Sequence, residues 1–205
     1  MASLLHLDSS ASPIDLSVSR QLTALYAQRW SGRRTYRDLA RDPVRLIGPG
    51  YVTLGTRRER EGVLAPADSD EAREWALTKP LIDELCAANV VLLGVPMYNF
   101  GVSAPLKAWI DRISFPGAYD DGGLHDTTVI AVLARGGAYG PGTPREGCDF
   151  QEPYLRAHFG KLGVTDLRFV RAELTRADDI PELGQFRDMA AKSLALAREQ
   201  LLAMV

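Results

Sequence analysis

Two groups of serines near the start of the chain have the composition of an anion site. Ser9, Ser10 and Ser12 directly follow an apolar run at residues 4–7, and a Ser-Val-Ser stretch at 17–19 opens a helical pattern. Backbone N–H groups and the dipole of a helix N-terminus favour a negative charge there. The loop therefore suggests a phosphate monoester held by neutral donors. The same residues could also form an ordinary helix cap after a solvated loop, and the loop alone leaves both readings open.

A second chemically suggestive segment follows the most apolar run of the chain, at 89–95. It places Met97, Tyr98, Asn99 and Phe100 together on one loop. Loops seldom carry so much apolar surface unless something covers it, and a flat heterocycle would suit these side chains. The Asn99 amide could then bind the polar edge of the ring. The alternative is that these side chains merely close the end of the core.

A third segment, Arg135-Gly136-Gly137, follows another apolar run. Two glycines allow a close backbone approach to a ligand and positive φ angles. Their N–H groups could then face a carbonyl or a developing negative charge. An ordinary glycine-rich turn is the simpler alternative for this segment taken alone.

Signatures of several other chemistries are missing from the sequence. It has no G-x-G-x-x-G, no G-x-x-x-x-G-K-[ST], no H-E-x-x-H and no G-x-S-x-G. Its three histidines show no metal-ligand spacing. We therefore expect neither a metal site nor a catalytic side chain acting as nucleophile.

The three segments must be positioned by alternating strands and helices. Continuous apolar runs are typical of buried parallel strands, and apolar residues at helical spacing indicate the helices between them. We expect strands at 3–7, 35–40, 89–95, 127–133 and 164–170. We expect helices at 17–30, 68–87, 105–113, 152–160 and 181–204, with a kink or break at Pro80. The Gly/Pro-rich stretch 41–66 is expected to be a long loop.

This order predicts one α/β domain over residues 1–205, with a parallel sheet covered by helices on both faces. Ligands of such sheets bind beyond the carboxyl ends of the strands, where all three segments fall. With 205 residues, 46% hydrophobic and 24% charged, the composition is that of a globular protein. A net charge of −2 argues against nucleic acid as the main partner. There is no transmembrane run and no signal-peptide pattern, so we expect a cytoplasmic protein without membrane contact. Cys86 is expected in the core, and neither cysteine suggests a disulfide framework.

Taken together, the segments resemble the FMN-dependent NADH:quinone and azo-compound reductases. The resemblance runs over about residues 3–175 and is carried by Ser9-Ser10 with Ser17-Val18-Ser19, PMYNF with LKAWIDRI, ARGGAYG, and YLRAHFGKLGVTDLRFVRAE. It implies a flavodoxin-like, doubly wound, five-stranded sheet and a homodimer with FMN near the interface. By position it assigns Ser9, Ser17, Val18 and Ser19 to the phosphate. It assigns Pro96, Met97, Tyr98, Asn99 and Phe100 to the flavin ring, and Arg135, Gly136 and Gly137 to its pyrimidine side.

The sequence departs from the family pattern in three places. Ala134 stands where a serine or threonine is common, and the serine loop is longer than in some members, which leaves the register of Ser10 and Ser12 open. The stretch 114–126 is short and atypical. Substrate preference is therefore the least transferable property, and the choice between NADH and NADPH stays open.

The implied function is two-electron (hydride) transfer from NADH or NADPH to a quinone or azo compound in a ping-pong cycle, with FMN carrying the chemistry. The alternative is a flavin-binding electron carrier or redox-responsive module without a nicotinamide site. The weak net charge and the aromatic loop favour the enzyme, since carriers of this fold usually present an acidic docking face.

Overall fold

A five-stranded parallel sheet forms the centre of the molecule, as the sequence predicts. The structure is a computed structural model and describes residues 1–120 and 122–205. Asp121, in the atypical stretch 114–126, lies outside the described residues. The strand order is β2-β1-β3-β4-β5, which is the flavodoxin-like order. The strands are β1 (Ser3–Asp8), β2 (Arg33–Asp38), β3 (Val90–Pro96), β4 (Thr128–Ala134) and β5 (Asp166–Ala172).

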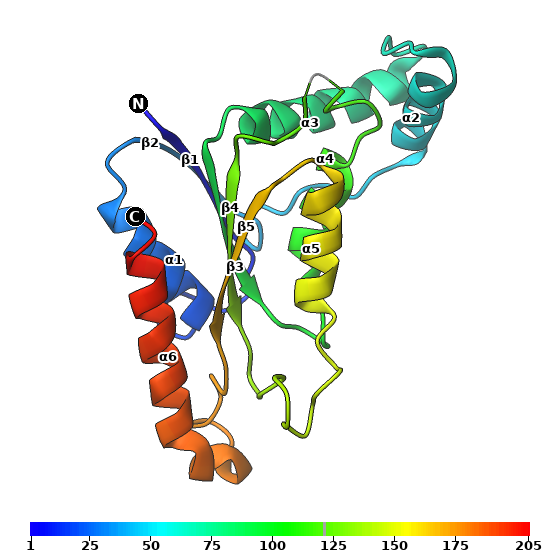
Figure 1. Cartoon of the computed structure of the whole chain (residues 1–205). Coiled ribbons are helices and arrows are strands. Elements are labelled where there is room, and N and C mark those ends of the chain that lie inside the picture. Colours follow the sequence, from blue (N-terminus) through cyan, green and yellow to red (C-terminus); the bar gives the residue numbers. More distant parts are fainter. Residues whose placement is uncertain (121) are drawn as a thin grey trace.

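Helices cover both faces of the sheet, seen edge-on in Figure 1. Leu22 of α1 and Leu201 of α6 share one buried cluster with Leu92 of β3. Leu85 of α3, Trp109 of α4 and Phe159 of α5 share the other with alternate strand residues. The helices of the two layers are α1 (Val18–Arg29) and α6 (Arg187–Leu202) on one face, and α3 (Ser69–Cys86), α4 (Ala104–Ile113) and α5 (Gln151–Lys161) on the other. Side chains alternate across a strand, so β1, β3 and β4 each contribute buried residues to both clusters.

One helix was not expected. The segment 41–66 contains α2 (Pro49–Glu61), which packs on α3 away from the sheet (Figure 1), so the expectation of a long loop is wrong. Pro49 occupies the first turn, where its missing N–H costs no hydrogen bond. Tyr51 and Leu54 supply the buried contact. Gly62 ends the helix with a left-handed φ of 71°, as a helix C-terminus favours.

The close approach of α2 to α3 requires a glycine at position 50. A Cβ there would lie 2.7 Å from the Asp70 carbonyl carbon and 2.9 Å from the Glu71 nitrogen, both backbone atoms. Replacing Gly50 by alanine should therefore lower the free energy of unfolding by about 1–3 kcal/mol, the usual cost of overpacking, measured by urea denaturation. Gly160 in α5 has no atom within 4 Å of its virtual Cβ. Gly160→Ala is the control, and equal stability of the two variants would contradict the close contact.

Three smaller expectations also need correction. Helix α3 continues through Pro80, so the expected break is wrong, while the expected kink stays a prediction. The C-terminal helix is divided into a 3₁₀ turn, η1 (Pro181–Phe186), and α6. Cys86, the last residue of α3, is exposed and does not lie in the core.

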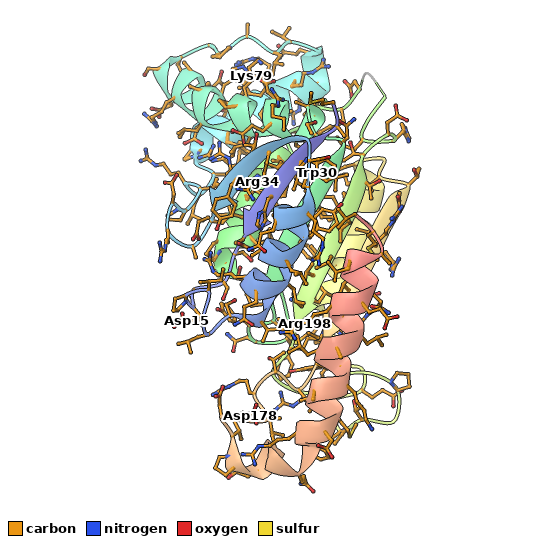
Figure 2. The ribbon with its side chains drawn as sticks, turned by 90° about the vertical axis from the view of Figure 1, so that its left-hand side faces the viewer. Asp15, Trp30, Arg34, Lys79, Asp178 and Arg198 are labelled. Carbon is orange, nitrogen blue, oxygen red and sulfur yellow. The ribbon has the colours of Figure 1, made fainter. Side chains whose placement is uncertain are left out.

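The carboxyl ends of the strands converge at one end of the molecule. In Figure 2, Asp15 of the serine loop lies toward the same end as Asp178, which follows β5, while Lys79 of α3 lies at the opposite end. The three segments that suggested chemistry leave β1, β3 and β4 at this end. Within the described residues, no helix is both long and apolar enough to cross a membrane.

Candidate functional site

The serine loop leads directly into the N-terminus of α1. Ser17 is the N-cap, and its hydroxyl accepts a hydrogen bond from the Arg20 N–H at 3.4 Å. The Ser17 and Ser19 hydroxyls are buried and lie 3.2 Å apart. The N–H groups of Val18 and Ser19 belong to the first turn, where no intrahelical acceptor exists. The helix-cap and anion-site interpretations of this loop are therefore compatible, because the cap engages only the Arg20 N–H and not the N–H groups of Val18 and Ser19.

The two serines that follow β1 have different roles. The Ser9 hydroxyl and N–H both donate to the Gly94 carbonyl of β3, at 2.9 and 3.2 Å. The Ser9 side chain thus joins β1 to β3 and has no donor left for a ligand. Ser10 is equally buried, accepts a bond from the Ser12 N–H at 3.3 Å, and donates its hydroxyl to no partner among the described residues. Ser10, whose register the sequence left open, has the free donor.

The loop after β3 is a tight hairpin turn. Tyr98 and Gly101 exchange two backbone hydrogen bonds, 3.1 and 3.0 Å long. Asn99 and Phe100 between them have φ angles of 48° and 70°, the combination that a type I′ turn requires. Positive φ is costly for a bulky residue such as phenylalanine, and such strain concentrates at functional sites. The turn presents both aromatic side chains at the surface, Tyr98 38% and Phe100 43% exposed.

Direct contacts bring the three loops together. The Tyr98 hydroxyl accepts a hydrogen bond from the Ala11 N–H of the serine loop at 3.1 Å. Met97 donates its N–H to the Ala134 carbonyl at the end of β4. The Phe100 ring packs edge-on against Tyr139, which follows the two glycines, with ring centroids 6.4 Å apart. The sequence placed these loops at one edge of the sheet, and the structure places them in contact.

The hydrogen bond between the serine loop and the β3 hairpin can be tested on its own. Tyr98→Phe removes the hydroxyl and keeps the ring, which leaves the Ala11 N–H without its acceptor. We expect the affinity for FMN, the ligand that the resemblance implies, to fall about three- to tenfold, because one neutral hydrogen bond contributes about 1 kcal/mol. Titration by flavin fluorescence measures this. Tyr154→Phe, on α5, is the control, and equal affinity of both variants and the parent would contradict the coupling.

The Arg-Gly-Gly segment differs from expectation in two respects. The Arg135 guanidinium, which the resemblance placed on the ligand side, is 3% exposed and donates to Asp149 at 2.6 Å and to Glu173 at 3.2 Å. These ion pairs hold the segment in place, and its backbone N–H donates to Ala172. Gly136 and Gly137 have no positive φ. Their N–H groups donate to no acceptor within the part of the chain that the structure describes, so both remain available for a ligand carbonyl or anion.

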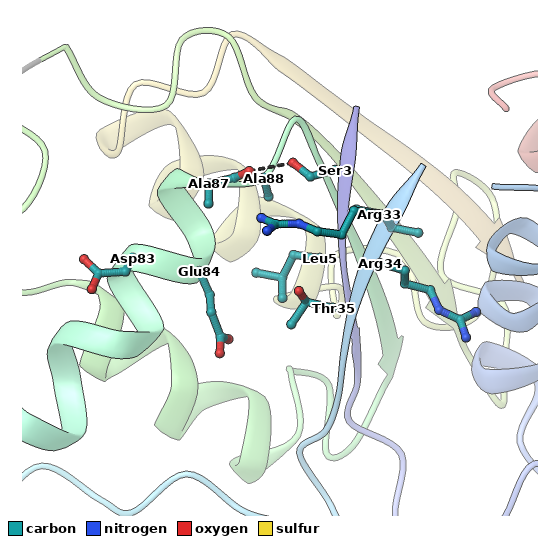
Figure 3. Close-up of a pocket in the computed structure, with 10 residues that line it drawn as sticks. Ser3, Leu5, Arg33, Arg34, Thr35, Asp83, Glu84, Ala87 and Ala88 are labelled. Atoms are coloured by element: carbon teal, nitrogen blue, oxygen red, sulfur yellow. Dashed lines mark hydrogen bonds between the residues drawn. The ribbon is translucent and has the colours of Figure 1, made fainter. Parts of the chain in front are cut away.

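The described residues line two cavities, one remote from this loop cluster and one beside it. The first, about 360 Å³, is at the amino ends of β1 and β2 beside the C-terminus of α3 (Figure 3). Ser3 lines it, whereas Ser9 leaves the other end of β1, so this cavity is remote from the serine loop. The second, about 690 Å³, lies along β5 and includes Arg135 and Tyr139. It therefore adjoins the Arg-Gly-Gly segment.

Comparison with known proteins agrees with this arrangement. Residues 2–194 match the family model described as "Flavodoxin-like fold". The chain is 40% identical to an "FMN-dependent NADH:quinone oxidoreductase" of Nocardia farcinica, covering 91% of this chain and 90% of that protein. It is 45% identical to "FMN-dependent NADH:quinone oxidoreductase 2" of Xanthomonas axonopodis pv. citri, covering 83% and 82%.

Solved structures share the fold. An azoreductase from Bacillus anthracis superposes with a TM-score of 0.83 at 20% identity, covering 100% of this chain and 98% of that one. An FMN-dependent NADH-azoreductase of the same species, solved in complex with FMN, gives 0.77 at 20% identity, covering 100% and 99%. The match to the family model and the sequence identity over nearly the whole length show that the chain belongs to the flavodoxin-like family of FMN-dependent NADH:quinone oxidoreductases.

Proposed function

We propose that this protein is an FMN-dependent oxidoreductase that takes a hydride from NADH or NADPH and transfers it to a quinone or azo compound. The observation that carries the proposal is the contact among three loops at the carboxyl ends of β1, β3 and β4. Together they offer donors for a phosphate group, aromatic and thioether surface for a flat ring, and free N–H groups for its polar edge. Sequence identity to reductases of this family supports the same activity.

The side chains present fit FMN. The α1 N-terminus and the buried Ser10, Ser17 and Ser19 hydroxyls suit a phosphate monoester, since neutral donors and a helix dipole bind such groups. The exposed hairpin turn at Asn99 and Phe100 suits a flat ring that would cover it. The residues that we propose as cofactor contacts are Ser10, Ser17, Val18, Ser19, Pro96, Met97, Tyr98, Asn99, Phe100, Gly136 and Gly137.

FMN, when bound, would supply the hydride chemistry, and we propose that the nicotinamide and the second substrate react in turn, in a ping-pong cycle. The chain contributes binding, orientation and charge stabilisation. The unpaired N–H groups of Gly136 and Gly137 would stabilise negative charge on the pyrimidine edge, about 1.5–3 kcal/mol for each bond to a charged group. The Arg135 ion pairs keep these two N–H groups in place.

A homodimer is part of the proposal. Phe150 is 62% exposed beside the hairpin, and its N–H donates to the Phe100 carbonyl at 3.1 Å. With Tyr98 and Phe100, it forms an apolar rim that is open in a single chain. A second copy that covers this rim would complete the site. Sedimentation velocity should show a dimer, and full activity of a monomer at low concentration would contradict it. The cytoplasmic location remains a prediction.

Absorption spectroscopy and turnover test the function. The purified protein should show flavin bands and should oxidise NADH or NADPH when menadione is added. If a fully flavin-loaded sample turned over with neither nucleotide, the enzyme proposal would be wrong and the electron-carrier alternative would remain. A protein that neither retains nor rebinds FMN would overturn both.

A further inference from the structure

Arg20 is a buried cation directly behind the serine loop. It lies in the first turn of α1 and is 7% exposed. Its Nε and Nη2 donate to the Ser10 carbonyl oxygen at 3.3 and 2.6 Å. Its Nη1 and Nη2 also form a bidentate pair with the Asp38 carboxylate at the end of β2, at 2.8 and 2.7 Å. One guanidinium therefore connects the serine loop with α1 and the edge strand.

Two carboxylates share the space around Arg20. Asp8, the last residue of β1, has a carboxylate oxygen 3.8 Å from Nη1 and accepts bonds from the Thr23 and Tyr36 hydroxyls. Burial tends to raise the pKa of Asp38, but the Arg20 hydrogen bonds and the backbone N–H groups of residues 40 and 41 outweigh it and lower the pKa overall. His6 lies 3.3 Å from the Asp8 carboxylate. Arg20 is the guanidinium that faces both acids.

This arrangement matters for a phosphate group nearby. A peptide carbonyl that turned toward a phosphate would repel it, and unpaired carboxylates would lower its affinity further. By donating to the Ser10 carbonyl oxygen, Arg20 fixes the orientation of the peptide group that joins Ser10 to Ala11. This group carries the Ala11 N–H and directly follows the Ser10 hydroxyl. By pairing with Asp38 and facing Asp8, it also offsets two negative charges next to an anion site.

We infer that Arg20 is a positioning residue that gives this protein its preference for the phosphorylated flavin over riboflavin. Arg20 acts through the serine loop and the neighbouring carboxylates, with no contact to the flavin ring. The inference rests on the proposed function, because it assumes that FMN binds at the serine loop.

The test compares the affinity of apoprotein for FMN and for riboflavin, which lacks the phosphate, by quenching of flavin fluorescence. Arg20→Met removes the charged guanidinium with its N–H donors and keeps an aliphatic side chain of similar length. We expect FMN affinity to fall on the order of tenfold or more, the usual effect of losing a group that orients a ligand-binding residue. Riboflavin affinity should change by less than about twofold, because its ring contacts are untouched.

Arg37→Met is the matched control. Arg37 lies on β2, next to Asp38, which is the partner of Arg20. It also forms a bidentate pair, with Glu84 of α3 on the other face of the sheet, and both hydrogen bonds are 2.6 Å long. Its loss should change stability and leave the FMN-to-riboflavin ratio as in the parent. If both variants lowered both affinities equally, Arg20 would have only a structural role and the inference would be wrong.

Arg20→Lys serves if the methionine variant does not fold. Lysine keeps the charge but cannot bond the Ser10 carbonyl and both Asp38 oxygens at once. We expect the ratio of FMN affinity to riboflavin affinity to fall in this variant as well, and an unchanged affinity ratio would overturn the inference. Measurements on the parent protein distinguish a failure of the proposed function from a failure of the role of Arg20. If it bound neither flavin, the proposed function would fail, whereas FMN preference retained in the Arg20 variants would overturn only the role of Arg20.

Discussion

Ser17→Asp should abolish FMN binding while the protein remains folded. Ser17 caps α1 through its hydroxyl, and aspartate is an equally good N-cap. A carboxylate at this position also interacts favourably with the helix dipole. The stability of the apoprotein should therefore be unchanged or slightly higher. The same carboxylate would occupy the space that we propose for the phosphate group.

The expected loss of affinity is large. Two like charges at about 4 Å repel by about 4 kcal/mol near a protein surface, and each 1.4 kcal/mol corresponds to about tenfold in Kd. We expect FMN affinity to fall by at least about a hundredfold and riboflavin affinity to change little. Thermal unfolding of the apoprotein checks the fold, and fluorescence titration measures the affinities.

Ser17→Asn provides the control for shape. Asparagine is a near-isostere of aspartate and also caps helices well, but it carries no charge. The difference in FMN affinity between the two variants isolates the effect of charge at this position. FMN binding by Ser17→Asp at the level of Ser17→Asn would mean that the phosphate lies elsewhere, and the serine loop would then be only a helix cap.

The sheet could be predicted because its central strands carry local signals. Val90–Pro96 and Thr128–Ala134 are continuous apolar runs, which few structures other than buried strands accommodate. Helix α2 could not be predicted in the same way. Its glycines at 50 and 55 are typical of turns, yet Gly50 is needed because the α3 backbone approaches too closely for a side chain, and Gly55 lies in tight contact with Pro116. Tertiary packing decides there against local propensity.

The site could be predicted only at the level of segments. The three loops were found because each follows an apolar run, but their internal geometry depends on distant partners. Nothing in the residue types at 99 and 100 indicates positive φ for a phenylalanine. The resemblance placed Arg135 against the flavin, and no local pattern singles out Arg20. The burial of both side chains follows from carboxylates on other elements. Ser9 and Ser10 are adjacent and identical in type, so only the position of Gly94 distinguishes the structural serine from the free one.

The largest loss of stability is expected for Arg112→Met. Arg112 in α4 is fully buried, and its Nη1 lies 2.9 Å from the Glu74 carboxylate of α3. It also donates to the Arg45 and Leu46 carbonyls at 2.7 and 2.9 Å, which holds the segment before α2 on the helical layer. Its removal would leave the buried Glu74 carboxylate with the Gly48 N–H at 3.4 Å but without its cation, and it would leave two carbonyls without this donor. The expected cost is about 3–5 kcal/mol, against total stabilities of about 5–15 kcal/mol for natural domains.

A double-mutant cycle shows whether the buried charge causes the loss. In Arg112→Met with Glu74→Gln, the amide has no net charge, so part of the lost stability should return and the coupling should exceed about 1 kcal/mol. Lys79→Met removes the ion pair between Lys79 and Asp83 in α3, the helix that also carries Glu74. Both of these side chains are more than half exposed. That control should cost less than about 1 kcal/mol. Urea denaturation at neutral pH gives the change in the free energy of unfolding, relative to the parent, for Arg112→Met, Glu74→Gln, the double variant and Lys79→Met. If Arg112→Met lost no more stability than Lys79→Met, the buried pair would contribute nothing to the fold, because a carboxylate without its cation cannot remain buried and charged at so small a cost.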